Sequence, residues 1–234
     1  MVYIYNSSLK RISNKMNRIA LIGDLVGSKK VKDRSELQEN LNDIFKKLNK
    51  ENKSILSPYT LTLGDEFQVV YSSGKNVLFD AVRICEKVYP QKIRFSYGIG
   101  KITTKINPIQ SIGMDGPAFY NARNGMNDLK KRNLKRRNKN NVFSIAGVDN
   151  YDHFMKLLFS GLKLFEHQIN RCKQNTLHII INLYSGNMPK VIAPQMGISI
   201  QAVYKFIRLK GLNETVEFIE TFENVLSYLI EEKK

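Results

Sequence analysis

The apolar residues near the start of the chain recur with two spacings, and each spacing indicates a different element. An unbroken apolar stretch over Arg18–Gly23 predicts a short buried strand. Apolar residues three and four positions apart predict helices over Ser35–Asn49 and Val77–Val88. Ser35 is expected to cap the first helix, and Pro90 is expected to end the second.

Further strands complete this pattern. Tyr59–Leu63 and Phe67–Tyr71 are rich in β-forming residues on either side of a turn at residues 64–66, which predicts a hairpin. Ile93–Ile102 predicts a strand after the second helix, and Asn141–Ile145 predicts a last one. The order β-α-β-β-α-β predicts an α+β fold of the ferredoxin-like kind, with one helical layer on an antiparallel sheet.

From Tyr151 onward the periodicity is only helical. It predicts helices over Asn175–Tyr184, Lys190–Met196 and Ile200–Leu209, with a turn at residues 197–199. Gly147–Asn150 is read as a boundary. We therefore expect an N-terminal tail over residues 1–16, a sheet domain over 17–149, and an all-α domain over 150–234 with a helix-turn-helix over 176–212.

The charge is unevenly distributed. The chain has 234 residues and a formal net charge of +16; its first 150 residues carry 27 basic and 13 acidic side chains, against 10 and 8 in the rest. The densest basic run is Lys130–Lys139, which either attracts phosphate groups or forms a solvated loop. No apolar run approaches the ~18 residues of a membrane span, and two cysteines are too few for a disulfide scaffold. These features favour a cytoplasmic protein without a membrane partner.

Two aspartates stand where strands are expected to end. Asp24 directly follows the apolar strand, and Asp65 lies at the hairpin tip. In this strand order the first and third strands are neighbours, so the two carboxylates are expected to approach each other. Mg²⁺ suits such a pair, because it takes carboxylate oxygens and leaves room for phosphates. The alternative is ordinary turn chemistry, in which each Asp side chain bonds nearby backbone N–H groups.

Polar and basic residues follow the first aspartate. Ser28, Lys29 and Arg34 are expected to cradle phosphate, together with backbone N–H groups if a helix begins there. The alternative for these residues is an exposed basic loop.

Three blocks of the sequence, in this order, closely resemble the SatD family of bacterial proteins: Arg18–Arg34, Thr62–Gln68 and Ile112–Arg123. This resemblance covers most of the chain, from about Met16 onward. The same blocks more distantly resemble the catalytic domain of class III nucleotidyl cyclases and its relatives with a GGDEF hairpin. That resemblance implies a palm-like β-α-β-β-α-β sheet and a nucleotide site.

The cyclase resemblance implies roles for single residues. Residues 24–28 are similar to the end of the cyclase first strand, and the hairpin with its Gly-Asp is similar to the cyclase hairpin. By this resemblance Asp24 and Asp65 hold Mg²⁺, Leu25 offers its backbone carbonyl, and Arg123 meets the triphosphate.

Three departures from the cyclase pattern change the expected chemistry. Leu61 stands where the cyclases carry the lysine that selects the base, and Phe119 stands where they carry the asparagine that stabilises the attacking ribose. Leu63 replaces the first glycine of the GGDEF string. We therefore expect a metal–nucleotide site rather than an active cyclase.

The string over Val191–Leu212 resembles the helix-turn-helix of many bacterial DNA-binding proteins. The residues expected to face outward and to contact DNA are Ser199, Gln201, Tyr204, Lys205 and Arg208. The alternative is a helix-turn-helix used for protein contact or only as a fold element, with Ile200, Val203 and Phe206 in the core.

The last helix carries an apolar stripe, which predicts core packing, with a homodimer interface as the alternative. The stripe consists of Phe218, Phe222, Val225 and Leu229.

Two functions from different classes fit these features. The first is a cytoplasmic DNA-binding regulator whose cyclase-like domain binds a nucleotide with Mg²⁺. The alternative is a Mg²⁺-dependent nucleotidyl- or phosphoryl-transfer enzyme that acts on a nucleoside triphosphate. A protein-interaction module would need neither site. The helix-turn-helix favours the first function, whereas Leu61 and Phe119 count against the second.

Overall fold

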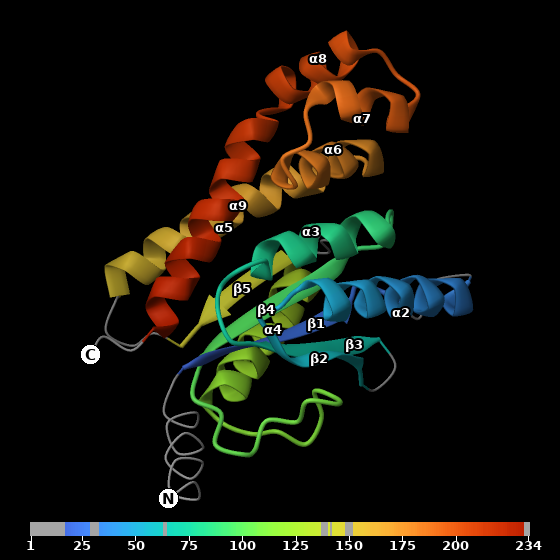
Figure 1. The fold of residues 1–234 in the computed structure, drawn as a ribbon. Helices are drawn as coiled ribbons and strands as arrows, with labels where there is room; N and C mark the ends of the chain where they lie inside the picture. Colours follow the sequence, from blue (N-terminus) through green and yellow to red (C-terminus); the bar gives the residue numbers. More distant parts are fainter. Residues whose placement is uncertain are drawn as a thin grey trace, which may run out of the picture.

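The computed structural model describes residues 17–28, 33–62, 65–136, 140, 142–147 and 152–231. Within these residues the chain forms a mixed α+β fold with one five-stranded sheet and eight helices (Figure 1). The expected tail over residues 1–16 and most of the expected boundary at Gly147–Asn150 lie outside the described residues.

The sheet is built around β1, Arg18–Leu25, with the strand order β2-β3-β1-β4-β5. The strands β1 to β4 pair in antiparallel fashion, whereas β5 pairs with β4 in parallel. The other strands are β2 Ile55–Leu61, β3 Glu66–Tyr71, β4 Ile93–Gly100 and β5 Val142–Ala146.

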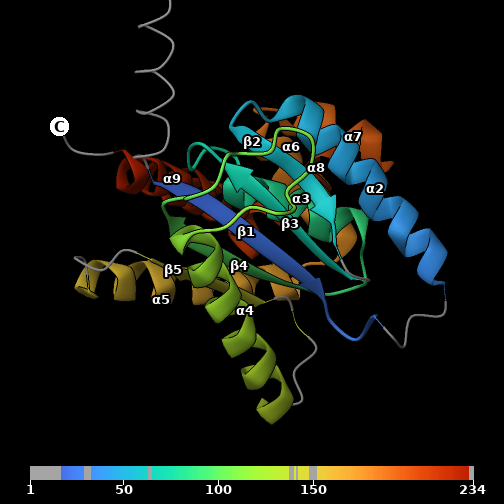
Figure 2. The same cartoon turned by 90° about the horizontal axis from the view of Figure 1, so that it is seen from below.

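Helices cover both faces of the sheet and β5 is parallel to β4, so the expectation of one helical layer on an antiparallel sheet is wrong in these two respects. Helices α2, Arg34–Glu51, and α3, Val77–Lys87, lie on one face, and α4, Pro117–Arg136, lies on the other (Figures 1 and 2). The period of two along β1 explains this sandwich, because Ile19 and Leu21 belong to the core under α2 and α3 while Ala20 and Ile22 belong to the core under α4.

The structure corrects several expected boundaries. Helix α2 begins at Arg34 rather than Ser35, because the side chain of Asp33 caps it by accepting a hydrogen bond from the Glu36 backbone N–H at 2.9 Å. Strand β2 begins at Ile55, before the expected Tyr59. Strand β1 extends beyond Gly23 through Leu25, so Asp24 lies within the strand and not after it.

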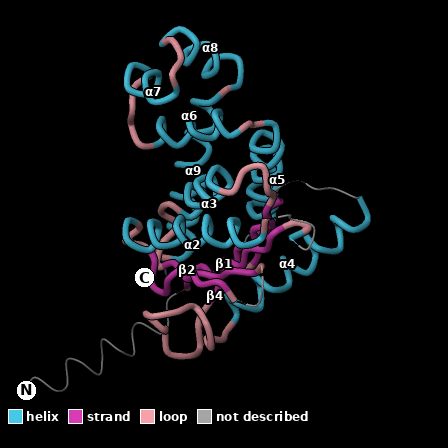
Figure 3. The backbone as a smooth tube through the Cα atoms, turned by 90° about the vertical axis from the view of Figure 1, so that its right-hand side faces the viewer, coloured by secondary structure: helices cyan, strands magenta, loops and turns pink. Residues whose placement is uncertain are grey.

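The remaining helices form a layer above α3 (Figures 1 and 3). They are α5 Asp152–Arg171, α6 Gln174–Tyr184, α7 Pro189–Met196, α8 Ile200–Lys210 and α9 Leu212–Ile230. Their buried residues, among them Phe165 and Phe222, join the same hydrophobic core as α2 and α3. Within the apolar stripe of α9, Phe222 is buried, and Phe218 and Leu229 pack against this core.

A buried glutamate fastens the helical layer to the sheet. Glu223 of α9 is 4% exposed and accepts hydrogen bonds from the first-turn N–H groups of Leu78 and Phe79 in α3, at 2.9 and 2.8 Å. It also accepts from the Asn76 N–H at 2.9 Å and from the Tyr184 hydroxyl at 2.6 Å. Asn76, which precedes α3 with φ 64°, makes no capping bond with its own side chain. Glu223 therefore supplies the cap that α3 lacks locally.

A second buried acid lies on the other side of α3. Asp80 is fully buried and accepts hydrogen bonds from the Asn52 side chain at 2.7 Å and the Tyr71 hydroxyl at 3.2 Å. The guanidinium of Arg83 stays 3.9 Å from its other carboxylate oxygen, which has no hydrogen-bond partner. Burial, the largest cause, raises the pKa of Asp80 to about 7.

At the outer end of the helical layer, α7 and α8 are joined by a short turn. Gly197 ends α7 in the left-handed region at φ 63°, and the Ser199 side chain caps α8 by accepting from the Ala202 N–H at 3.1 Å. Ala193 and Val203 are buried between the helices. None of the helices that the structure describes combines the length and apolar composition that a membrane span requires.

Candidate functional site

The candidate site is an open cleft of about 720 Å³ at the end of β1, between the sheet and α4. Asp24 pairs with Glu66 of β3 on one side and with Arg94 of β4 on the other. Directly opposed residues place their side chains on the same face, so all three lie on the face that α4 covers. We call this the strand-end cleft, and its lining residues are Asp24, Leu61, Thr62, Asp65, Glu66, Gln68, Ile112, Arg123 and Lys130.

Helix α4 brings the two cations of the cleft. Arg123 and Lys130 are seven residues apart, about two turns, and therefore share one side of the helix. The helix can approach the sheet closely because Gly98 and Gly125 carry no side chain. A Cβ at Gly98 would stand 2.0 Å from the Ala118 carbonyl oxygen, and one at Gly125 would stand 2.4 Å from the Ser96 hydroxyl.

Ion pairs connect the acids and cations of the cleft. Asp24 accepts from the Arg94 guanidinium through Oδ2, and the Lys130 ammonium lies 2.8 Å from its Oδ1. Arg123 Nη1 donates to both carboxylate oxygens of Glu66 at 2.7 Å, and Lys130 lies 3.7 Å from Glu66. Lys130 therefore stands between two carboxylates, the position in which a bound cation would lower their mutual repulsion.

The other predicted aspartate lies beside this network. The Asp65 carbonyl accepts from the Leu25 N–H at 3.2 Å, so the backbones of the hairpin turn and β1 are adjacent. The carboxylate of Asp65 accepts from the Ser28 hydroxyl, and Ser28 is buried. Asp24 in β1 and Asp65 in the turn before β3 thus line one cleft.

The structure separates the predicted phosphate-binding residues. Arg123 lines the cleft, Ser28 binds Asp65, and Leu25 buries its side chain in the core. Arg34 is exposed at the start of α2 and is not among the lining residues of the cleft. Lys29 lies outside the described residues.

The number and arrangement of the acids in the cleft can be compared with the ligands that Mg²⁺ requires. Among the described residues, no group of three or more acidic, histidine or cysteine side chains forms a metal cage. Mg²⁺ is nevertheless commonly held by one or two carboxylates together with substrate phosphates. Asp24 and Glu66 already share one cation in Lys130, which is 40% exposed and attached by a flexible side chain. The acids therefore fit a metal that arrives with a phosphate ligand better than a resident metal.

Sequence reasoning missed three charged residues of this ion-pair network: Glu66 and Lys130, which line the cleft, and Arg94, which binds Asp24. Glu66 follows Asp65 directly, and the extension of β1 through Asp24 would have placed it opposite that residue. Lys130 belongs to the basic run, whose helical register with Arg123 was the available signal. Asn121, two residues after Phe119, uses its side-chain amide to donate to the Ile99 carbonyl at 2.9 Å.

The second predicted interface is the outer surface of α8. Its five predicted DNA contacts are all exposed: Ser199, Gln201, Tyr204, Lys205 and Arg208. The alternative interpretation placed Ile200, Val203 and Phe206 in the core. Val203 is buried, but Ile200 and Phe206 are 42% and 37% exposed, so that interpretation is wrong for Ile200 and Phe206. Helix α4, with the described part of the basic run, lies on the opposite side of the sheet from α8 (Figures 1 and 3).

The fold and the cleft define an α+β protein with paired acids and cations at one end of its sheet. The SatD family profile matches residues 18–218, and the chain therefore belongs to the SatD family. A comparison with curated proteins found no match.

Proposed function

We propose that this SatD-family protein is a cytoplasmic DNA-binding regulator whose α+β part binds a nucleotide with Mg²⁺. The outward face of α8 carries the proposal. It presents hydroxyl, amide and cationic groups on a helix that is capped at Ser199 and Gly211 and joined to α7 by a short turn. A helix of this kind suits the major groove, where such groups bond base edges and phosphates. In this proposal α7 and α8 form a helix-turn-helix.

The arrangement of the sheet supports the nucleotide part of the proposal. The element order β-α-β-β-α-β and the strand order β2-β3-β1-β4 fit the proposal of a ferredoxin-like, palm-like sheet, with β5 added at the edge. In such a sheet the end of β1 and the β2–β3 hairpin meet. Asp24 and Asp65 line the cleft there.

The charges of the cleft suit a metal–triphosphate ligand. In the proposed complex Asp24, Asp65 and Glu66 would hold Mg²⁺, which would neutralise the acids and bind phosphate oxygens. Arg123 and Lys130, 46% and 40% exposed, are free to turn from the acids toward the phosphates. Arg94, 14% exposed, would stay on Asp24 and keep the carboxylate in position.

The DNA part is tested by removing charge from α8. The double variant Lys205→Ala/Arg208→Ala is expected to bind genomic DNA fragments more weakly at low salt. Its affinity should also depend less on salt, because each phosphate that the protein no longer neutralises reduces the salt slope by roughly 0.9. Gln201→Ala is expected to change sequence preference more than affinity. Gel shifts over a salt series measure both effects.

The matched control is Lys46→Ala/Lys47→Ala, which removes the same charge from the exposed side of α2. Equal weakening by this pair would mean that only net charge matters. Equal binding by the wild type and the α8 variant would exclude α8 as a DNA reader. The exposed Ile200 and Phe206 would then favour a protein partner for this helix.

The nucleotide part is tested with Asp24→Asn. Titration calorimetry with ATP or GTP is expected to show binding only with Mg²⁺ and at least a tenfold loss in the variant, because the amide cannot supply the charge that the metal needs. Asp128→Asn, an exposed acid on α4, is the control. Wild-type protein that binds neither nucleotide in Mg²⁺ contradicts the proposal, and a thermal melt of Asp24→Asn confirms that the variant is folded.

The same samples examine the enzyme alternative. The exposed cations Arg123 and Lys130 are of the type that stabilises a transferring phosphoryl group. Chromatography of the nucleotide after incubation with Mg²⁺ would show diphosphate, monophosphate or cyclic product if the cleft is catalytic. An unchanged triphosphate would leave binding as the role of the cleft.

A further inference from the structure

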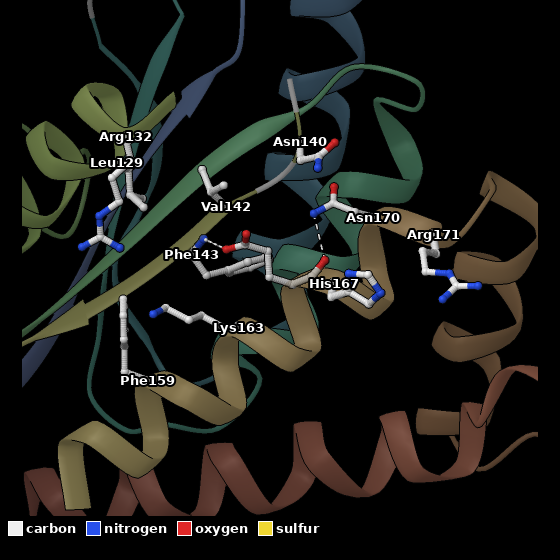
Figure 4. A pocket seen from close by; sticks show the side chains of 11 residues that line it. Leu129, Arg132, Asn140, Val142, Phe143, Phe159, Lys163, His167, Asn170 and Arg171 are labelled. Carbon is white, nitrogen blue, oxygen red and sulfur yellow. Dashed lines mark hydrogen bonds between the residues drawn. The ribbon is translucent and has the colours of Figure 1, made fainter. Parts of the chain in front are cut away.

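A second polar cavity lies at the edge of the sheet, away from the strand-end cleft. It has a volume of about 460 Å³ and is enclosed by the C-terminal half of α4, by β5 and by one side of α5 (Figure 4). We call it the α4–α5 groove. Its lining includes Arg132 from α4, Val142 and Phe143 from β5, and Lys163, His167 and Arg171 from α5.

Unpaired cations dominate the groove. Arg132 and Lys163 come from different helices and converge on the ring of Phe159, at 5.5 and 4.5 Å from its centroid. Within the part of the chain that the structure describes, neither these two nor Arg171 forms an ion pair with a carboxylate. Cations that face one cavity without forming ion pairs repel each other, and an anion between them would remove this cost.

The acid in the groove is turned toward the sheet. Glu166 Oε2 accepts a hydrogen bond from the Phe143 N–H of β5 at 3.1 Å. Its carboxylate thus satisfies a backbone donor of the edge strand. The described cationic side chains therefore outnumber the acid in the groove by three to one.

The floor of the groove is apolar. Val142 of β5 and Leu129 of α4, 6% and 3% exposed, form this floor, whereas the Phe143 ring points to the other face of the sheet and packs against Phe95 and Phe165. The amide side chain of Asn140 lines the same cavity, as does Asn170, whose Nδ2 donates to the Glu166 carbonyl at 2.8 Å. A ligand that fits therefore has an anionic group for the cations, an apolar face for the floor, and a hydrogen-bonding edge for Asn140.

We propose that the α4–α5 groove binds a nucleoside phosphate without a metal ion, with Arg132 and Lys163 on the phosphate and the base against Val142 and Leu129. The volume lies in the range of pockets for small ligands, whereas the phosphates of a duplex meet protruding side chains rather than an enclosed cavity. The same nucleoside phosphate unit occurs as a free nucleotide and within a single strand of nucleic acid. This proposal does not depend on the roles proposed for the strand-end cleft and α8.

The test uses the full chain at low salt in EDTA, which removes the metal that the strand-end cleft requires. The probe is a short fluorescein-labelled oligothymidylate, measured by anisotropy in the Lys205→Ala/Arg208→Ala background so that α8 contributes little. Arg132→Glu/Lys163→Glu is expected to weaken binding at least tenfold, since hydrogen bonds to charged partners are the strong ones. The salt slope is expected to fall by roughly 0.7 for each phosphate of the strand that the variant no longer neutralises.

A matched control isolates the groove. Lys46→Glu/Lys47→Glu reverses two exposed charges on α2, the same change in net charge as the groove variant. It is expected to keep binding within about twofold of the background protein, a difference of under half a kcal/mol. Equal loss in this control would overturn the proposal, because binding would then follow net charge.

Competitors identify the source of the ligand. Displacement of the probe by AMP, with much weaker displacement by inorganic phosphate, would support a site for a single nucleotide. Groove-dependent binding of the oligonucleotide that AMP does not displace would support a site for a strand. No binding of the probe in EDTA, equal displacement by phosphate and AMP, or equally tight groove-dependent binding of a duplex would each overturn the proposal.

Discussion

Replacing Glu223 by alanine will lower the free energy of unfolding by about 3–5 kcal/mol. The change leaves three backbone donors without an acceptor, the N–H groups of Asn76, Leu78 and Phe79. It also removes the partner of the Tyr184 hydroxyl and the negative charge at the positive end of α3. Each unsatisfied buried group costs about 1–3 kcal/mol, and water that enters the space offsets part of the sum.

Urea unfolding of the variant beside Glu217→Ala measures this effect. Glu217 lies on the same helix but is exposed, so its loss is expected to change stability by no more than about 0.5 kcal/mol. Tyr184→Phe, which removes only one of the hydrogen bonds to Glu223, is expected to cost about 1 kcal/mol. Equal stability of Glu223→Ala and Glu217→Ala would show that the helical layer is held by apolar packing alone.

The stability of the protein will fall as the pH rises through the range in which Asp80 titrates. Burial raises the pKa of Asp80 from 3.8 to about 7. Between these values the folded state keeps a proton that the unfolded state has lost, so folding is favoured at the acid end and the advantage disappears as the pH approaches 7. The full shift corresponds to about 4 kcal/mol.

The comparison with Asp80→Asn isolates this contribution. Asparagine keeps an acceptor for the Asn52 side chain but cannot ionise, so its stability relative to the wild type is expected to increase from pH 4 to pH 8. Burial also raises the pKa of Glu223, which acts in the same direction in both proteins and cancels in the difference. Asp43→Asn, at an exposed site on α2, is the control. A constant difference between wild type and Asp80→Asn over this range would contradict the pKa shift.

Elements whose cores follow one clear period could be predicted from the sequence. The apolar positions of α2, Leu37 to Leu48, and those of α3, Val77 to Cys85, are the residues that the structure buries. The end of β1 could not be predicted in the same way, because a polar residue in an apolar run reads as a strand end. Asp24 stays in the strand because Arg94 and Lys130, from β4 and α4, neutralise its charge.

Of the candidate site, the sequence could predict only the features that depend on which strands are neighbours. The proximity of Asp24 and Asp65 needs only the order of strands, and the structure places both on one cleft. To predict the cations of the cleft, one would have to know the position and rotation of α4. Both depend on close packing at Gly98 and Gly125. The role of Glu223 is still harder to predict. In the sequence, a buried capping acid on an amphipathic helix looks the same as a solvent-exposed acid until the partner helix is known.

The cap of α3 has a consequence for the order in which the chain acquires its structure. During synthesis the sheet and α3 leave the ribosome well before α9, because the chain emerges from its N-terminus, and the parts that emerge first can begin to fold first. Until residue 223 has emerged, the first turn of α3 lacks the acceptor for the N–H groups of Leu78 and Phe79. The nascent α+β part therefore exposes the N-terminus of α3, whose free N–H groups favour an anion. It also exposes the apolar surface that later packs against Phe222 and Leu226. Completion of the fold awaits the last helix, so truncation within α9 weakens an element formed more than a hundred residues earlier.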